Sequence, residues 1–355
     1  MKYSCLLLVV LALAVKQPGA AIADVLLPAI VSDGMVLQRD TSAPIWGWAR
    51  AGERVCVTIA AQSHATIAAN DGRWCVWLDA LSAGGPHELV VQGDNRLVID
   101  DVLVGEVWLG SGQSNMAMEV YLCERADEEI ALARHPTLRM FREDSGPSDL
   151  REGLGCGMWQ TCSPQTVGMF SATLYYFGCE LQVELNVPVG LINSSLGGTP
   201  IQSWTSVEAQ SGRPELRELF ARLAERDVGF DPVAARAHFK QLLATWKVKA
   251  AEARRKGAPV PRKPVDPVEA RARQGAPGEL FDGKIAPLIP YGLRGVIWYQ
   301  GEQNAPPAWA PFYRYQLPLL VQDWRERWGR PDLPFVWVQL PNHRTPCDWP
   351  TIREA

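Results

Sequence analysis

The stretch Gly105-Glu-Val-Trp-Leu-Gly-Ser-Gly-Gln-Ser-Asn-Met116 carries a run of apolar residues directly into a serine. An apolar run bounded by small residues predicts a short buried strand, and Gly110 and Gly112 allow a tight turn after it. Ser114 then stands where a helix would begin, with its hydroxyl and its backbone N–H free to face a cleft. Two interpretations fit this pattern: Ser114 caps the helix, or it is a nucleophile whose N–H helps to bind an oxyanion.

Two common motifs are excluded around this serine. Met116 occupies the last position of the Gly-x-Ser-x-Gly elbow of α/β-hydrolases, which disfavours a lipase or peptidase of that type. Asn115 occupies the place of the third glycine of a dinucleotide-binding fingerprint, so a nucleotide cofactor is not indicated.

The composition of the 355-residue chain indicates a globular protein with substantial cores, since 47% of its residues are hydrophobic. Its length favours two domains. A net charge of −4 predicts binding neither to nucleic acid nor to an anionic membrane. No Cys-x-x-Cys pair indicates a zinc site, and the sequence predicts buried free thiols for most cysteines, with pairing of Cys56 with Cys75 or of Cys156 with Cys162 left open.

The first residues are typical of a secretory signal peptide. Lys2 precedes a short apolar run from Cys5 to Val15, and Ala21-Ile22-Ala23 is a small-x-small cleavage site. We therefore expect cleavage after Ala23 and a secreted or periplasmic protein. No later stretch reaches the roughly 20 apolar residues of a membrane span, so no membrane association is expected after cleavage.

The remaining chain has two different patterns of apolar residues. Residues 24–103 contain short alternating runs separated by turns, which predicts a small antiparallel β-sandwich or jelly roll, with strands at residues 35–38, 43–48, 54–59, 73–78 and 87–91. From residue 104 to 355, strands alternate with helices, which predicts an α/β domain with a parallel, doubly wound, five-stranded sheet. Its strands are expected at residues 104–109, 138–141, 189–193, 295–299 and 335–340, with helices at 171–185 and 311–328. Residues 208–275 are read as a helical insertion with solvated faces.

Four tryptophans fall close together in the first region: Trp46, Trp48, Trp74 and Trp77. Exposed tryptophans stack on sugars, but large aromatic residues at alternating strand positions usually face inward. Core packing is therefore the expected role.

Polar groups follow three of the predicted parallel strands. Ser114 follows the first strand, the paired glycines Gly197 and Gly198 follow the third, and Glu302 and Asn304 follow the fourth. Because open parallel sheets bind ligands at the carboxyl ends of their strands, these groups should meet at one edge. A nucleophile, an exposed backbone turn and an amide donor together favour acyl transfer with a three-donor oxyanion hole.

The blocks that carry these groups resemble the signature blocks of the sialate O-acetylesterase family of SGNH (GDSL-like) hydrolases. They are Gly112-Gln-Ser-Asn-Met116, Gly190-Leu-Ile-Asn-Ser-Ser-Leu-Gly-Gly-Thr199 and Trp298-Tyr-Gln-Gly-Glu-Gln-Asn304. The likeness extends to Gly34-Met-Val-Leu-Gln38, Pro44-Ile-Trp-Gly-Trp48, Gly72-Arg-Trp74 and the residues 281–290, and so covers nearly the whole mature chain. Gln303 departs from the family pattern, in which serine is commoner.

The resemblance implies a three-layer α/β/α fold and an esterase that removes O-acetyl groups from sialic acid or related glycans. Ser114 would be the nucleophile that forms an acetyl-enzyme. The N–H of Ser114, a backbone N–H at Gly197 or Gly198 and the amide of Asn304 would bind the oxyanion. Gln113 and Glu302 would orient the site. No metal or organic cofactor is implied, and the partner is an O-acetylated sugar; the oligomeric state is left open.

The general base of the family has no clear counterpart in this sequence. In SGNH hydrolases an Asp-x-x-His motif follows the fifth strand, and this sequence has none. Only His343, with Asp348 nearby, falls after that strand, but its spacing is wrong, and Asp348 is expected to open a helix instead. We therefore expect a C-terminally truncated chain with low or no activity. Two functions remain open: a serine carbohydrate esterase, and a non-catalytic glycan-binding protein or inactive fragment.

Overall fold

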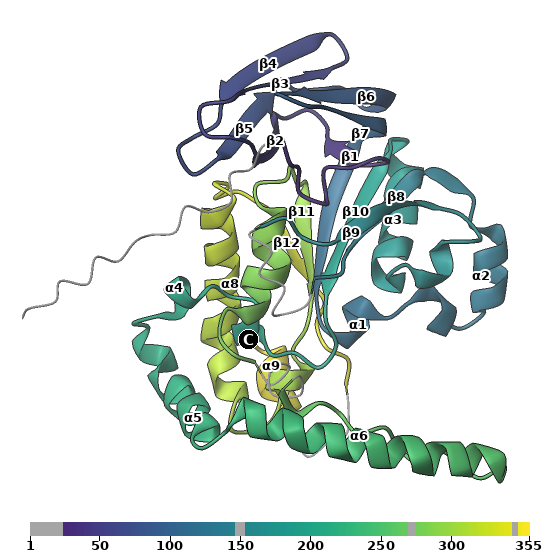
Figure 1. The fold of residues 1–355 in the computed structure, drawn as a ribbon, viewed down its shortest axis with the longest axis vertical. Helices are drawn as coiled ribbons and strands as arrows, with labels where there is room; N and C mark the ends of the chain where they lie inside the picture. Colours follow the sequence, from purple (N-terminus) through teal and green to yellow (C-terminus); the bar gives the residue numbers. More distant parts are fainter. Residues whose placement is uncertain (1–23, 146–152, 269–274, 343–346) are drawn as a thin grey trace, which may run out of the picture.

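The computed structural model describes residues 24–145, 153–268, 275–342 and 347–355. The predicted signal peptide and His343 lie outside these ranges. Within them the fold is a large mixed sheet flanked by helices, with an antiparallel β region at one end (Figure 1). No helix among the described residues is long and apolar enough to cross a membrane.

The antiparallel region is formed by the first strands of the chain. β3 (Arg54–Ile59) pairs with β4 (Gln62–Ile67) and with β6 (Gly84–Gln92), and β6 pairs with β7 (Arg96–Gly112). A second, two-stranded sheet of β2 (Ala43–Trp48) and β5 (Arg73–Leu78) completes this region, and β1 (Val36–Gln38) joins β7 in parallel. This arrangement agrees with the predicted N-terminal β region.

The strand β7 connects the two parts of the molecule. Its first half belongs to the antiparallel ladder, and its second half is the central strand of the parallel sheet. The predicted domain division at residues 103 and 104 falls inside this continuous strand. The division stays a prediction.

The parallel sheet confirms the predicted fold class. β7 lies between β10 (Val189–Ser195) and β11 (Gly295–Tyr299); β8 (His135–Glu143) pairs with β10, and β12 (Phe335–Trp337) pairs with β11. All four pairings are parallel. β9 (Gly157–Cys162), which was not predicted from the sequence, adds an antiparallel edge next to β8.

Helices cover both faces of this sheet, as the alternation of side chains along β11 shows. Ile297 packs with residues of α3 (Ala172–Leu185), among them Leu174, in one core cluster. Trp298 packs edge-on against Trp324 of α8 (Tyr313–Arg327), with ring centroids 5.9 Å apart, in another. Because neighbouring strand residues point to opposite faces, α3 and α8 lie on opposite sides of the sheet (Figure 1).

The predicted insertion is helical, and its helices differ in how they pack. α4 (Val207–Gln210) and α5 (Arg217–Asp227) precede α6 (Pro232–Arg255), a long helix whose described side chains are buried only at Ala250. α5 instead buries Leu219 and Leu223 against Phe312 and Leu319 of the main body. α6 therefore exposes most of its surface, whereas α5 packs against the main body.

The remaining helices are short. α1 (Ser114–Ala117), α2 (Ala126–Leu132) and α9 (Trp349–Arg353) have four to seven residues each, and Asp348 stands at the start of α9 as predicted. The seven described cysteines are all free, so neither pairing that the sequence left open is formed.

Candidate active site

The candidate nucleophile stands where the central strand meets α1. Ser114 is exposed and is the first residue of α1, two positions after the end of β7 at Gly112. Gly112 has a φ of +132°, and a Cβ built there would lie 2.1 Å from the carbonyl oxygen of Tyr299. Only glycine fits this close approach of the paired strands β7 and β11, so the two strands can place Ser114 at their common carboxyl edge.

The glycine turn after β10 lies against this serine. The N–H of Leu196 donates to the carbonyl of Gly112 at 3.0 Å, and a Cβ on Gly197 would lie 3.5 Å from Cβ of Ser114. Gly198 has a φ of +74° and open space around its Cα. The backbone N–H groups of Ser114, Gly197 and Gly198 donate to no acceptor among the described residues, so all three are available to a ligand.

Asn304 is almost fully buried and is held by three hydrogen bonds. Its Oδ1 accepts from the N–H of Ile201 at 2.9 Å and from Nε2 of Gln300 at 2.8 Å. Its Nδ2 donates to Oε1 of Gln202 at 3.2 Å. A side-chain amide carries two N–H donors, so one of the Asn304 donors remains for a ligand.

A buried amide cluster joins the edges that follow β7, β10 and β11. Nε2 of Gln300 lies 3.1 Å from Oε1 of Gln113 and 3.1 Å from the carbonyl of Thr199, besides its bond to Asn304. Oε1 of Gln113 also accepts from the backbone N–H of Gln303 at 3.2 Å. The cluster fixes the relative positions of the three loops, because hydrogen bonds in a buried site hold one geometry.

Glu302 is linked to the residue that follows the candidate nucleophile. Its Oε1 accepts from Nδ2 of Asn115 at 2.6 Å, and its Oε2 is buried without a hydrogen-bond partner among the described residues. Burial raises the pKa of Glu302, and the hydrogen bond from Asn115 offsets part of that rise. The carboxyl group therefore gains a proton more readily than an exposed glutamate does.

No histidine among the described residues is bonded to Ser114, whose Oγ has no hydrogen-bond partner within the same ranges. His64 pairs with Asp79 in the antiparallel region, His135 packs edge-on against Tyr175, and His87 and His238 lie on β6 and α6. His343, the position that the sequence offered for a base, lies outside the described residues.

A small cavity of about 210 Å³ adjoins the Asn304 side of the site. It is lined by Pro200, Gln202, Leu223, Arg226, Gln303, Asn304 and Trp309. Leu223 and Arg226 come from α5, so the docked insertion helix forms one wall. No cluster of three or more metal-binding side chains occurs in the described part of the chain.

Gln300 and Gln202 hold Asn304 in place, and neither was predicted as a site residue from the sequence. Gln300 sits inside the block from Trp298 to Asn304 that was already singled out, so its position at the strand end was a usable signal. Gln202 and Arg226 carry no comparable pattern, because their part in the site depends on how the η3 turn (Ile201–Ser203) and α5 pack.

Comparison with known proteins identifies relatives over most of the chain. Residues 284–355 match the family described as carbohydrate esterase, sialic acid-specific acetylesterase, a region that includes Asn304 but not Ser114. Sialate O-acetylesterase of Rattus norvegicus is 31% identical over 88% of this chain and 59% of its own length. The Homo sapiens protein of that name is 30% identical over 87% of this chain and 56% of its own.

A solved structure extends the likeness to the fold. The crystal structure of a carbohydrate acetylesterase from Xanthomonas citri superposes with a TM-score of 0.72 at 30% identity, covering 93% of this chain and 65% of that one. The chain thus spans less than two thirds of the length of these relatives. By sequence and by fold, the chain is thus similar to sialate O-acetylesterases and to a carbohydrate acetylesterase.

Proposed function

We propose that this protein is a serine esterase that removes O-acetyl groups from an acetylated sugar, with Ser114 as nucleophile. The observation that carries the proposal is the placement of Ser114: an exposed hydroxyl at the carboxyl end of the central strand, beside Gly197, with three backbone N–H groups free around it. An exposed nucleophile next to unpaired N–H donors is the arrangement that acyl transfer requires.

The proposed reaction has two stages. Oγ of Ser114 attacks the acetyl carbonyl carbon and loses its proton to a base, and the sugar oxygen leaves with a proton, which leaves an acetyl group on the serine. Water then attacks the acetyl-enzyme, acetate leaves, and the serine recovers its proton. In both stages the negative oxygen is bound by the N–H groups of Ser114 and Gly197 or Gly198 and by the second donor of Asn304.

Gln113 and Glu302 act in this scheme as positioning residues. Gln113 holds the loop after β11 through the N–H of Gln303, and Glu302 holds Asn115 next to the nucleophile. Neither needs to touch the substrate for the reaction to proceed.

The substrate class follows from the relatives, which carry the names sialate O-acetylesterase and carbohydrate acetylesterase. We therefore propose an O-acetylated sialic acid or a related acetylated glycan. We also propose that the protein acts outside the cytoplasm, on the strength of the signal peptide predicted at residues 1–23.

A second function, glycan binding without catalysis, is favoured by one observation: no histidine among the described residues reaches Ser114. The two functions differ in whether Ser114 becomes acylated. A covalent probe answers this even if turnover is slow, because it reports the nucleophile directly.

The test combines hydrolysis of 4-nitrophenyl acetate with labelling by a fluorophosphonate, located by mass spectrometry of the peptides. We expect the label on Ser114 and its loss, together with acetate release, in Ser114→Ala. Ser111→Ala is the matched control, because Ser111 is fully buried on β7, the strand that leads to Ser114, and its Oγ has no hydrogen-bond partner among the described residues. Labelling elsewhere, or equal loss in both variants, would contradict the proposal.

A further inference from the structure

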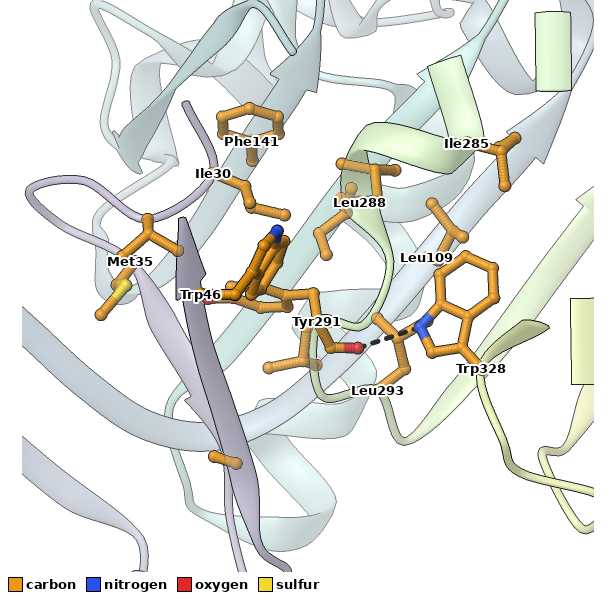
Figure 2. Close-up of a cluster of buried hydrophobic side chains, with 14 of the residues drawn as sticks. Ile30, Met35, Trp46, Leu109, Phe141, Ile285, Leu288, Tyr291, Leu293 and Trp328 are labelled. Carbon is orange, nitrogen blue, oxygen red and sulfur yellow. Dashed lines mark hydrogen bonds between the residues drawn. The ribbon is translucent and has the colours of Figure 1, made fainter. Parts of the chain in front are cut away.

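The two-stranded sheet of β2 and β5 turns one of its faces toward the main body of the molecule. Residues opposite one another in an antiparallel pair point to the same face, and here Trp48 stands opposite Arg73 and Trp46 opposite Cys75. Trp46 is nearly buried and packs edge-on against Tyr291, with ring centroids 6.1 Å apart (Figure 2). This contact holds the face against the main body, and Trp48 and Arg73 lie next to it on the same face.

A cleft of about 550 Å³ opens beside this contact. One wall is formed by Trp46, Trp48 and Arg73, and the other by Asp282, Ile289 and Pro290 of the segment before β11. Its size falls within the range of about 300–1,000 Å³ that is typical of ligand sites. None of the residues that line it belongs to the site around Ser114.

The polar and aromatic groups of the cleft have unused binding capacity. Trp48 is half-buried, its ring makes no aromatic pair with another described residue, and its indole N–H has no acceptor among them. The side chain of Arg73 is 74% exposed, and its one ion pair among the described residues, with Asp71, is long at 3.8 Å. The side chain of Asp282 is exposed and accepts no hydrogen bond from a described residue.

From this combination we infer that the cleft is a second carbohydrate-binding site, which takes an uncharged pyranose unit of a glycan. The C–H face of a pyranose is apolar and weakly positive, so it packs well on the face of an indole ring. Its hydroxyl groups both donate and accept, which matches a carboxylate acceptor in Asp282 and guanidinium donors in Arg73.

The charge of the cleft favours a neutral ligand. Arg73 and Asp282 carry opposite charges, so an anionic sugar gains attraction from one and repulsion from the other. The binding of a neutral sugar unit is not weakened by either charge. The cleft therefore differs in preference from a site built to bind an acidic sugar.

This inference stands apart from the esterase proposal, because binding in the cleft requires no catalytic residue. The experiment is made on the wild-type chain, because the probes carry no acetyl ester that the proposed esterase site could hydrolyse. Binding of mannohexaose, xylohexaose and galactohexaose at millimolar concentration is measured by isothermal titration calorimetry. A sialyl-lactose titration serves as the acidic comparison.

We expect at least one neutral hexasaccharide to bind, and Trp48→Ala to weaken that binding about tenfold or more. Asp282→Asn should weaken it less, because the amide keeps an acceptor oxygen. Trp77→Ala is the matched control: Trp77 lies on β5, is 55% exposed and does not line the cleft, so its removal should leave affinity unchanged. Circular dichroism melting curves for each variant separate loss of binding from loss of fold.

Three results would overturn the inference. They are failure of every neutral probe to bind, equal weakening by Trp48→Ala and Trp77→Ala, and tighter binding of sialyl-lactose than of any neutral probe. Acetyl-ester hydrolysis by the wild-type chain is measured separately, so failure of the cleft and failure of the esterase proposal are distinguishable.

Discussion

Nδ2 of Asn115 donates to Oε1 of Glu302 at 2.6 Å, although the two residues are 187 positions apart in the sequence. This bond ties the first turn of α1 to the loop after β11, and so fixes the residue next to Ser114. The same carboxyl group has a second, buried oxygen with no hydrogen-bond partner among the described residues, and its pKa is raised by burial. The protonation state of Glu302 therefore affects the stability of the folded protein.

We predict that Glu302→Gln reduces the dependence of stability on pH. Because the pKa of Glu302 is higher in the folded protein than in the unfolded chain, its contribution is fully present below the unfolded pKa and is lost as pH rises through the folded value. Urea unfolding of both proteins from acidic to neutral pH measures this. Wild type should lose more stability than the variant as pH rises, and parallel curves would show that Glu302 titrates normally.

Asn304 is expected to contribute both to the stability of the fold and to the rate of acylation of Ser114. Asn304→Ala leaves the N–H of Ile201 without its acceptor and removes one of the three acceptors of Nε2 of Gln300, which should cost about 1–3 kcal/mol of unfolding free energy. Loss of an oxyanion donor should also slow acylation of Ser114 by about 10²–10³-fold.

Asn304→Asp separates these two roles, because it keeps an acceptor oxygen but removes the amide donor. We expect a smaller loss of stability than in the alanine variant and a rate at least as low, measured by stopped-flow acylation. Wild-type acylation by Asn304→Asp would exclude the donor role.

The two glycines beside the serine should differ in their tolerance of a side chain. Gly112→Ala places a Cβ against the carbonyl of Tyr299, so we expect a loss of more than about 2 kcal/mol and impaired acylation. Gly198→Ala meets open space and pays only for its positive φ, about 1–2 kcal/mol, while its backbone N–H is kept. Chemical denaturation and acylation rates check both, and equal effects would show that the approach of β7 to β11 at Gly112 is not tight.

The docking of α5 is also testable. Leu219 is fully buried between α5 and the main body, so Leu219→Ala should cost about 2–5 kcal/mol. Val233 on α6 is 77% exposed, and Val233→Ala should change stability by less than about 0.5 kcal/mol. Similar values from thermal unfolding would mean that α5 is as solvated as α6.

Strands with a clear apolar run could be predicted from the sequence. β11 (Gly295–Tyr299) agrees with its expected range because five mostly apolar residues stand between polar neighbours. β4 and β9 were missed because both contain polar residues and neither is a buried central strand. The continuity of β7 was hidden by Asp100-Asp101, which resembles a turn; Asp101 adopts a φ of +58° inside the strand.

The order of the parallel strands predicts which loops meet at the candidate site, but not the hydrogen bonds between their side chains. Parallel strands bring their carboxyl ends to one edge, which is why Ser114 could be expected near Gly197. The bonds of Gln300 to Gln113 and Asn304 depend on side-chain directions that no spacing rule contains. The catalytic roles of these residues stay predictions.

The source of the general base yields the last prediction. Because no described histidine contacts Ser114, we expect slow release of acetate by the 355-residue chain, since a positioned base contributes about 10²–10⁴-fold. Added imidazole should then accelerate hydrolysis by diffusing to Ser114, with no acceleration in Ser114→Ala. His343→Ala should leave both the basal and the imidazole-assisted rates unchanged. If instead the chain is fast without imidazole and His343→Ala abolishes that rate, His343 is the base, and the expectation drawn from the missing Asp-x-x-His motif is wrong.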